Sequence, residues 1–339
     1  MKTTVKIKKW QLVRYKSQDT VADLTQKEFI AVGKRAFRKQ KELREVLLPS
    51  GLTAVKAEAF LGCDALESVL LCEQDCVGIS SSTFANCKNL TVLQNAQVVT
   101  AIGERAFMGC EKLEAPTFGR YLRKIGAFAF AKCASVRQLE LPACIKSVGD
   151  AAFSDCVSLE KVEMQEGFSA VSPAMFRGCG ALSDVTLPTT VCEISASMFR
   201  DCAALAQIEL PSQMKKIGKK AFLGCGKMEQ ITLPLGVTSI GGRAFDRMPA
   251  LREVILPHSI RRLGFGAFGL GFPKKGSEKI KLFVDSEYMM RRMKHRLILC
   301  GSYFRVELIR TGKTIEERKR ERHRANLEQK PAHLMDDFD

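Results

Sequence analysis

Phenylalanine recurs along this chain at an almost constant interval. Nine of the ten intervals in the series are 23 residues and one is 24, although the chain of 339 residues has only 20 phenylalanines. A period between about 20 and 50 residues is typical of stacked repeat architectures. The eleven members of the series are Phe37, Phe60, Phe84, Phe107, Phe130, Phe153, Phe176, Phe199, Phe222, Phe245 and Phe268.

Other residues keep the same phase, when positions are counted from the Phe of each repeat. Position −5 is always a branched aliphatic residue, from Val32 to Leu263, and position +6 is usually Leu. Such a pattern predicts a core that continues from one repeat to the next. Position +3 is cysteine in eight consecutive repeats, at Cys63, Cys87, Cys110, Cys133, Cys156, Cys179, Cys202 and Cys225.

The spacing within a repeat predicts two kinds of element. Aliphatic residues at +9 and +11, such as Ile208 and Leu210, face one side of a short strand, and a frequent proline at +12 ends that strand. Apolar residues at 0, +3 and +6 predict a short helical turn, and the glycine at −4 is interpreted as a turn residue with a flexible backbone. Stacked repeats bury both faces, with strands about 4.8 Å apart. The prediction is an α/β repeat solenoid.

The repeat resembles the BspA-type leucine-rich repeats, whose pattern is roughly I-G-x-x-A-F-x-x-C-x-x-L-x-x-V-x-L-P. It reads IGERAFMGCEKLEAP from Ile102 and IGKKAFLGCGKMEQITLP from Ile217. The resemblance covers about residues 20–270 and the ends, and it implies a right-handed coil of parallel strands and helical turns. Repeats three and four depart from the pattern at Asn95, Ala96 and Pro116. We expect a bulge or a weakened sheet there.

The chain is predicted to have four parts. An N-terminal hairpin cap occupies 1–31, the eleven repeats occupy 32–271, a C-terminal cap occupies 272–310, and a charged, flexible tail occupies 311–339. In the C-terminal cap we expect a strand in KIKLFV, a helix to about Leu299 and a strand in YFRVELI. The cap shields the end of the hydrophobic column.

The phenylalanines and cysteines are interpreted as core rather than as chemistry. Stacked cysteines at +3 could form disulfides or hold a metal, but free Cys is also a small, buried, apolar residue. A disulfide ladder needs an oxidising compartment, and zinc needs ligands in tetrahedral spacing. The pair Cys72 and Cys76 lacks a second pair or a histidine. We predict no metal site and no disulfide.

Catalysis has little support in the sequence. Three of the four histidines lie outside the repeats, and none has an obvious nucleophile or carboxylate partner. A phosphate-binding glycine loop and an H-E-x-x-H motif are both absent from the sequence. The prediction is a non-enzymatic protein without a cofactor.

The outward side chains of the strands are the candidate binding surface, because solenoids bind through their extended faces. Positions +8 and +10 should point outward, and from repeat five onward they are polar and mildly acidic. We predict that a protein ligand binds there. The candidate residues are Gln138, Glu140, Lys161, Glu163, Asp184, Gln207, Glu209, Gln230 and Glu253.

A basic excess leaves other partners open. The net charge is +16; residues 1–31 carry seven Lys/Arg against three Asp/Glu, and residues 269–339 carry 17 against 11. A second face is basic before the Phe, as at Arg123, Lys124 and Lys216. Binding of nucleic acid through the basic termini is one alternative, although the mixed charges of the tail weaken it.

Targeting and membrane-spanning segments bear on where in the cell the protein is expected. It contains no apolar run of the kind found in signal peptides and no stretch of 18 apolar residues. We therefore expect a cytoplasmic protein without membrane insertion. If a signal peptide upstream was missed, the resemblance would instead imply a secreted or surface adhesin.

Overall fold

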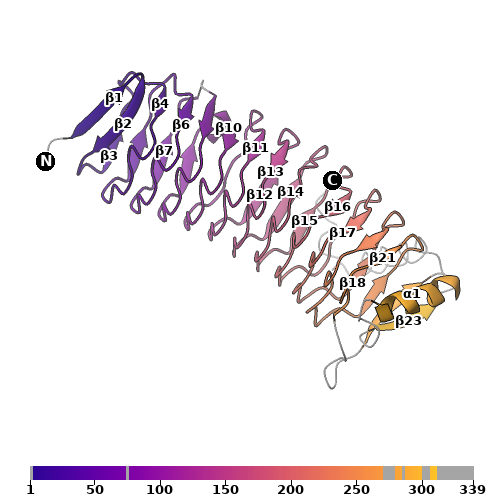
Figure 1. Cartoon of the computed structure of the whole chain (residues 1–339). Helices are drawn as coiled ribbons and strands as arrows, with labels where there is room; N and C mark the ends of the chain where they lie inside the picture. Colours follow the sequence, from indigo (N-terminus) through magenta and orange to yellow (C-terminus); the bar gives the residue numbers. More distant parts are fainter. Residues whose placement is uncertain (1–2, 74–75, 270–278, 285–286, 300–305, 311–339) are drawn as a thin grey trace, which may run out of the picture.

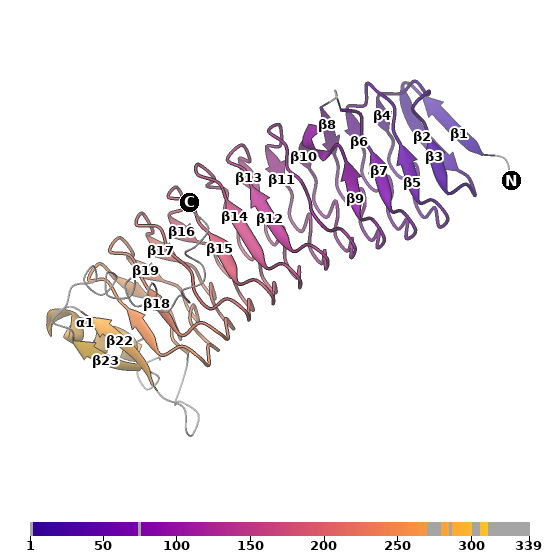
Figure 2. The ribbon, with the colours of Figure 1, turned by 180° about the vertical axis from the view of Figure 1, so that it is seen from behind.

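The chain forms an elongated coil of about twelve stacked turns. The computed structural model describes residues 3–73, 76–269, 279–284, 287–299 and 306–310. Each turn crosses the coil twice, so that short parallel strands stack along two sides (Figures 1 and 2). The hairpin at the N-terminal end and helix α1 (Glu287–Leu299) lie at opposite ends of the coil (Figure 1).

The upstream strands precede the Phe of each repeat. They form an eight-stranded sheet, β1-β2-β4-β6-β8-β10-β11-β13, in which only the β1–β2 hairpin is antiparallel, and a four-stranded sheet, β16-β17-β19-β21. Their bounds are β1 Thr4–Lys8, β2 Gln11–Lys16, β4 Ala31–Val32, β6 Ala54–Val55, β8 Val77–Ile79, β10 Val99–Ile102, β11 Lys124–Ile125, β13 Ser147–Val148, β16 Glu193–Ile194, β17 Lys216–Ile217, β19 Ser239–Ile240 and β21 Arg262–Leu263.

The downstream strands follow the Phe of each repeat. They form three sheets, β3-β5-β7-β9, β12-β14-β15 and β18-β20-β22-β23, and a short 3₁₀ helix, Ala96–Val98, follows β9. Their bounds are β3 Val21–Asp23, β5 Glu45–Leu47, β7 Ser68–Leu70, β9 Val92–Gln94, β12 Gln138–Leu141, β14 Lys161–Met164, β15 Asp184–Thr186, β18 Gln230–Thr232, β20 Glu253–Ile255, β22 Ile280–Val284 and β23 Val306–Arg310.

The aromatic rings form one continuous stack in the core. Successive phenylalanine rings from Phe37 to Phe268 lie 4.5–5.9 Å apart between centroids, with interplanar angles of 3–19°. Each ring is almost fully buried, and burial of such a side chain contributes roughly 1.5–3 kcal/mol. Tyr15 adds a ring 4.8 Å from Phe37, so the stack begins within the N-terminal hairpin.

The predicted helical turns are absent, and this part of the α/β prediction is wrong. Within the described residues α1 is the only α-helix. Backbone φ is positive at positions −2 and +2 of the ten repeats from Phe37 to Phe245, for example 55° at Phe128 and 63° at Lys132. A right-handed helix cannot continue through left-handed residues. The fold is therefore a β-solenoid.

The same alternation joins each turn to the next. The backbone N–H groups of Phe128, Phe130 and Lys132 donate to carbonyl oxygens of the following turn at 2.9, 2.7 and 2.8 Å. These groups would bond within the segment in a helix, whereas here they form a third ladder between turns. The apolar residues at 0, +3 and +6 still point into the core, so the pattern is compatible with both conformations.

The glycine at position −4 has a different role from the one predicted. Gly103, Gly126 and Gly149 do not have positive φ, so the turn does not depend on their flexibility. A Cβ at Gly149 would instead lie 2.3 Å from the backbone nitrogen of Ala127 in the preceding turn. The residue is small because neighbouring backbones approach closely at this position.

The cysteines at position +3 are buried and free. In all eight turns the Sγ–H group donates to the carbonyl oxygen of the Phe in the preceding turn, at 3.0–3.2 Å. Free Cys is a weak donor of this kind as well as a small apolar residue. Burial raises the pKa of the thiols of Cys63 and Cys225 to about 12.

The ladder of downstream strands is interrupted between β9 and β12. Residues 114–118 of the fourth repeat form no strand, and Asn95 and Pro116 stand where the repeat has aliphatic residues. Pro116 has no N–H to donate to a ladder. This break therefore falls at the fourth repeat, which departs from the pattern. The ladder is interrupted again between β15 and β18, where residues 206–210 form no strand although Ile208 and Leu210 fit the pattern.

The C-terminal end is closed by β22, α1 and β23. Met293 and Leu297 of α1 are buried in the main core, whereas Ile255, Phe283 and Ile309 form a small separate cluster. The charged tail predicted at 311–339 lies outside the described residues.

We predict that Phe153→Ala lowers the free energy of unfolding by about 3–5 kcal/mol, because the ring is buried between two others and its loss leaves a cavity. Urea denaturation followed by circular dichroism measures the change. Val157→Ala is the control, since this side chain is 54% exposed. Equal stability of the Phe153 variant and the native chain would refute the placement of the ring.

We predict that a thiol reagent modifies Cys76 and Cys192 in the native chain and leaves the eight cysteines of the ladder unmodified, because only the former pair is exposed. The thiolate is the reactive form. A raised pKa keeps the thiols of Cys63 and Cys225 protonated, so a change from pH 7 to pH 9 should not speed their reaction. Mass spectrometry locates the modified residues. All should react in denaturant, and rapid native labelling of Cys63 would contradict the prediction.

Candidate functional site

The outward side chains of the downstream strands form a surface that we call the downstream face. It is defined by positions +8 and +10 of repeats five to ten, from Gln138 to Glu253. Lys161 and Glu253 are half-buried and the other seven candidate residues are exposed. Gln207 and Glu209 lie in a segment without a strand, whereas the other seven lie on β12, β14, β15, β18 and β20.

Strand pairing places these side chains in rows. In one row Gln138 pairs with Lys161, and Lys161 pairs with Asp184; in the next, Glu140 pairs with Glu163. Lys161 Nζ lies 3.7 Å from Glu163 Oε2 and 4.0 Å from Asp184 Oδ2. Exposed ion pairs of this kind contribute only about 0–1 kcal/mol. The carboxylates therefore do little for the stability of the fold.

A hollow of about 440 Å³ lies at the N-terminal end of this face. It spans the gap in the strand ladder, and its size is in the range of ligand-binding pockets. The proline at position 116 predicts a weakened sheet but not a hollow. The residues that line it are Pro116, Thr117, Phe118, Gln138, Leu139, Glu140, Pro142, Lys161, Glu163 and Gln165.

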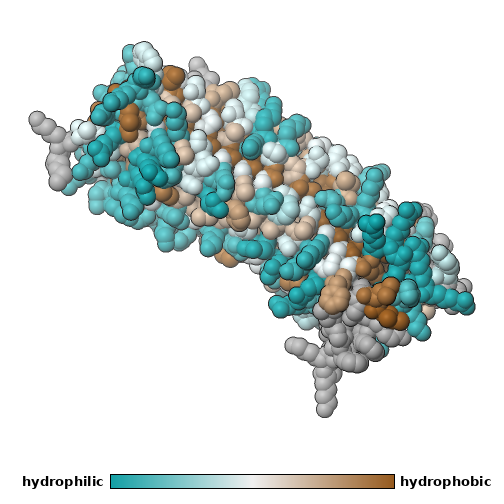
Figure 3. Space-filling view, in the orientation of Figure 1, coloured by the Kyte–Doolittle hydropathy of each residue, from teal (hydrophilic) through white to brown (hydrophobic). Residues whose placement is uncertain are grey.

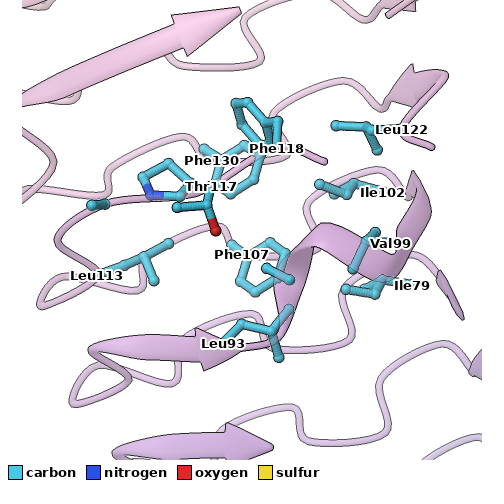
Figure 4. A pocket seen from close by; sticks show the side chains of 13 residues that line it. Ile79, Leu93, Val99, Ile102, Phe107, Leu113, Thr117, Phe118, Leu122 and Phe130 are labelled. Carbon is cyan, nitrogen blue, oxygen red and sulfur yellow. The ribbon is translucent and has the colours of Figure 1, made fainter. Parts of the chain in front are cut away.

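An apolar cavity of about 30 Å³ lies on the other side of the segment 116–118. Leu93, Phe107, Leu113 and Phe118 surround it, as Figure 4 shows. The ring of Phe118 meets Phe130 edge to face, with the centroids 5.7 Å apart. The segment thus separates a hollow at the surface from a small cavity in the core.

A basic cluster lies on the upstream strands near the C-terminal end. Lys216 of β17 and Arg262 of β21 both pair with Ser239 of the strand between them. Lys216 pairs with Glu193, and Arg243 with Asp246. The other five cations have no carboxylate within 4 Å among the described residues. The cluster consists of Lys215, Lys216, Lys219, Lys220, Arg243, Arg261 and Arg262, and the exposed Phe265 lies beside it.

The described part of the chain contains no group of three or more His, Cys, Asp or Glu residues that could hold a metal ion. Its one helix is too short and too polar to cross a membrane. His258 and His295 are exposed, and His323 and His333 lie outside the described residues. One side of the coil carries mainly hydrophilic residues with apolar patches between them (Figure 3).

Comparison with solved structures finds several similar proteins, of which the first supports the same fold. A leucine-rich repeat protein from Bacteroides ovatus is 19% identical, with a TM-score of 0.54 over 91% of this chain and 98% of that one. A leucine-rich cell surface protein from Faecalibacterium prausnitzii is 18% identical over 91% and 92% of the two chains, with a TM-score of 0.44. The T. pallidum leucine-rich repeat protein is 23% identical over 60% and 87%, with a TM-score of 0.42.

Comparison with curated proteins gives no match. The model of the family described as "BspA type Leucine rich repeat region" matches residues 19–119, 77–205 and 146–270 of this chain. Together these ranges cover most of the sequence and include every phenylalanine of the core stack. The chain therefore belongs to the BspA-type leucine-rich repeat family.

Proposed function

We propose that this protein is a non-enzymatic scaffold that binds a protein partner on the downstream face between Gln138 and Glu253. The observation that supports it best is the hollow of about 440 Å³ beside rows of exposed polar side chains. Both are held by strands whose inward residues are fully packed, as at Val162, which is 0% exposed.

The rigid ladder is what makes this face suitable for binding. A partner that binds a preorganised surface does not have to order it, and the entropic cost of association is correspondingly smaller. The face carries exposed carboxylates at Glu140, Glu163, Asp184 and Glu209, and Lys161 is the one cation at positions +8 and +10 of repeats five to ten. A partner with basic side chains is therefore favoured, because complementary charges speed encounter and fix orientation.

We predict that the triple variant Glu140→Lys, Glu163→Lys, Glu209→Lys captures its partner at least about tenfold less well than the native chain, because a charge reversal turns attraction into repulsion. The readout is affinity capture from the native cell, with quantification of bound proteins by mass spectrometry. A circular dichroism melt checks that the triple variant is folded.

The matched control is Glu28→Lys, Glu42→Lys, Asp150→Lys. It makes the same change of net charge at three exposed positions outside the downstream face. Capture should be close to that of the native chain. If both triple variants capture the same proteins in the same amounts as the native chain, the downstream face is not the binding surface.

A second function, binding of nucleic acid, is favoured by the basic cluster and the exposed ring of Phe265, which is 66% accessible. Cations bind phosphates and release counterions, and aromatic rings stack on bases. Five of the seven cations lack a carboxylate within 4 Å among the described residues, so their charge is not neutralised locally.

We predict that Lys215→Gln, Lys219→Gln, Arg261→Gln, Arg262→Gln weakens the binding of a fluorescent single-stranded oligonucleotide and reduces the dependence of its Kd on salt, with each lost phosphate contact lowering the slope by about 0.7. Fluorescence anisotropy at several salt concentrations gives both quantities. Lys34→Gln, Lys39→Gln, Lys112→Gln, Lys132→Gln is the control, with the same charge change at four exposed positions outside the basic cluster and the basic termini. Equal slopes for the two variants would argue against this function.

A further inference from the structure

A backbone bond joins neighbouring turns of the downstream ladder at four positions and is missing from the described residues at Val92, Ala115, Gln138, Gln207 and Gln230. Among these positions only Gln138 lines the hollow of about 440 Å³. The N–H at position +8 donates to the carbonyl oxygen at +7 of the preceding turn, as from Lys161 to Arg137 and from Asp184 to Glu160, both at 3.1 Å. Gln138 occupies the same position on β12, and no such bond joins it to Glu114 within the described residues. Strand β12 pairs with β14 alone. It is an edge strand in the middle of the coil.

The fourth repeat explains why this edge is left open. Position +9 is Pro116, whose nitrogen carries no hydrogen, whereas the same position is Val46, Leu139 or Val162 in other repeats. Two residues later, Phe118 turns into the core, where its ring packs against Phe130 and Phe153 at 5.7 and 6.4 Å. With Phe118 fixed in the core, the segment 116–118 does not follow the strand path, and the hollow opens between it and β12.

We propose that the hollow is a strand-addition site, in which an extended segment of the protein partner pairs with the open edge of β12. This inference rests on the proposed function and specifies how the partner is held. Backbone N–H and C=O groups at an exposed sheet edge pair readily with an added strand, and neighbouring pockets select its side chains. The segment pairs along β12, which runs from Gln138 to Leu141.

The lining of the hollow defines the chemistry of the segment. Pro116, Phe118 and Pro142 give it an apolar side, and Glu140 and Glu163 give it an acidic side. Lys161, the one cation of the lining, already lies within 4.0 Å of Glu163 and Asp184. The ligand is therefore an extended peptide that alternates apolar residues with Lys or Arg.

The position of the edge also limits what can bind to it. Exposed sheet edges are a hazard for aggregation, and proteins protect them with proline, charges or covering loops. Here the third and fifth turns stand on either side of the gap, and Pro116 lies at its border. The flanking turns limit access to this edge, which favours a single extended segment over a second sheet.

The test uses a variant that completes the ladder. Pro116→Val together with Phe118→Leu places at +9 and +11 the residue types that other repeats have there, and restores an amide donor. A phage-displayed library of random heptapeptides is selected on the immobilised full-length native chain, and the Kd of selected peptides is measured by fluorescence anisotropy. We expect selected peptides to alternate apolar and basic residues, and to bind the double variant at least about tenfold more weakly.

Hydrogen exchange gives a readout that a purely side-chain contact would not affect. The selected peptide should slow exchange of the amides of Gln138 and Glu140 at least about tenfold in the native chain, because these amides would donate to the added strand. Pro211→Val, a change at a proline of the eighth repeat away from the hollow, should leave both Kd and exchange as in the native chain.

Three results would overturn strand addition: selection without an enriched peptide, equal affinity for the double variant, or binding that leaves the two amides unprotected. None of these results contradicts the proposal that the downstream face binds a protein, because that proposal depends on Glu209 as well as on Glu140 and Glu163. If charge reversal abolishes capture of the native partner while the double variant captures it fully, the downstream face binds protein and the partner does not pair with β12.

Discussion

Each turn stacks on the next so that equivalent residues lie over one another. The rest of this structure depends on that constraint. With a repeat of 23 residues, each aromatic ring, branched aliphatic residue and cysteine lies over its equivalent, and the ring centroids stay 4.5–5.9 Å apart. The one interval of 24 residues keeps this register, since the rings of Phe60 and Phe84 stack at 5.1 Å and Val55 pairs with Ile79. The rings, the thiol–carbonyl bonds and the backbone ladders all depend on the same period.

That period is why so much of the fold could be predicted. Residues that recur with the period must face the core in every turn. The repeat pattern from Phe37 to Phe268 therefore predicts the strands, the buried positions and the outward positions. The conformation around each Phe could not be predicted in the same way, because apolar residues at 0, +3 and +6 face inward in a helical turn and also in the alternating right- and left-handed backbone. The left-handed positions are occupied by residues as different as Lys132, Asp155 and Gly178, so no residue type marks them.

The same limit applies to the candidate site. Outward side chains such as Glu140 and Glu163 follow from the phase of the repeat, and the structure places them in one row. The hollow cannot be predicted from the repeat pattern, because it results from the way Pro116 and Phe118 depart from that pattern. A proline inside an expected strand indicates an interruption, but the volume left behind depends on where Phe118 goes, and its contacts with Phe130 and Phe153 cross between turns.

A regular repeat presents nearly the same backbone at every turn, so a partner that reads the backbone alone cannot select one position along the coil. Side chains at +8 and +10 vary, but they lie on a surface that is otherwise uniform. A missing strand is different in kind, because it leaves the edges of its neighbours without a partner strand. Such interruptions occur at the fourth and eighth repeats, and the one at the fourth repeat is accompanied by the hollow beside β12. If a partner strand adds at β12 as proposed, the departure from the repeat at Pro116 and Phe118, rather than the repeat itself, would make binding specific to one position, and the stacked turns on either side would hold that position in place.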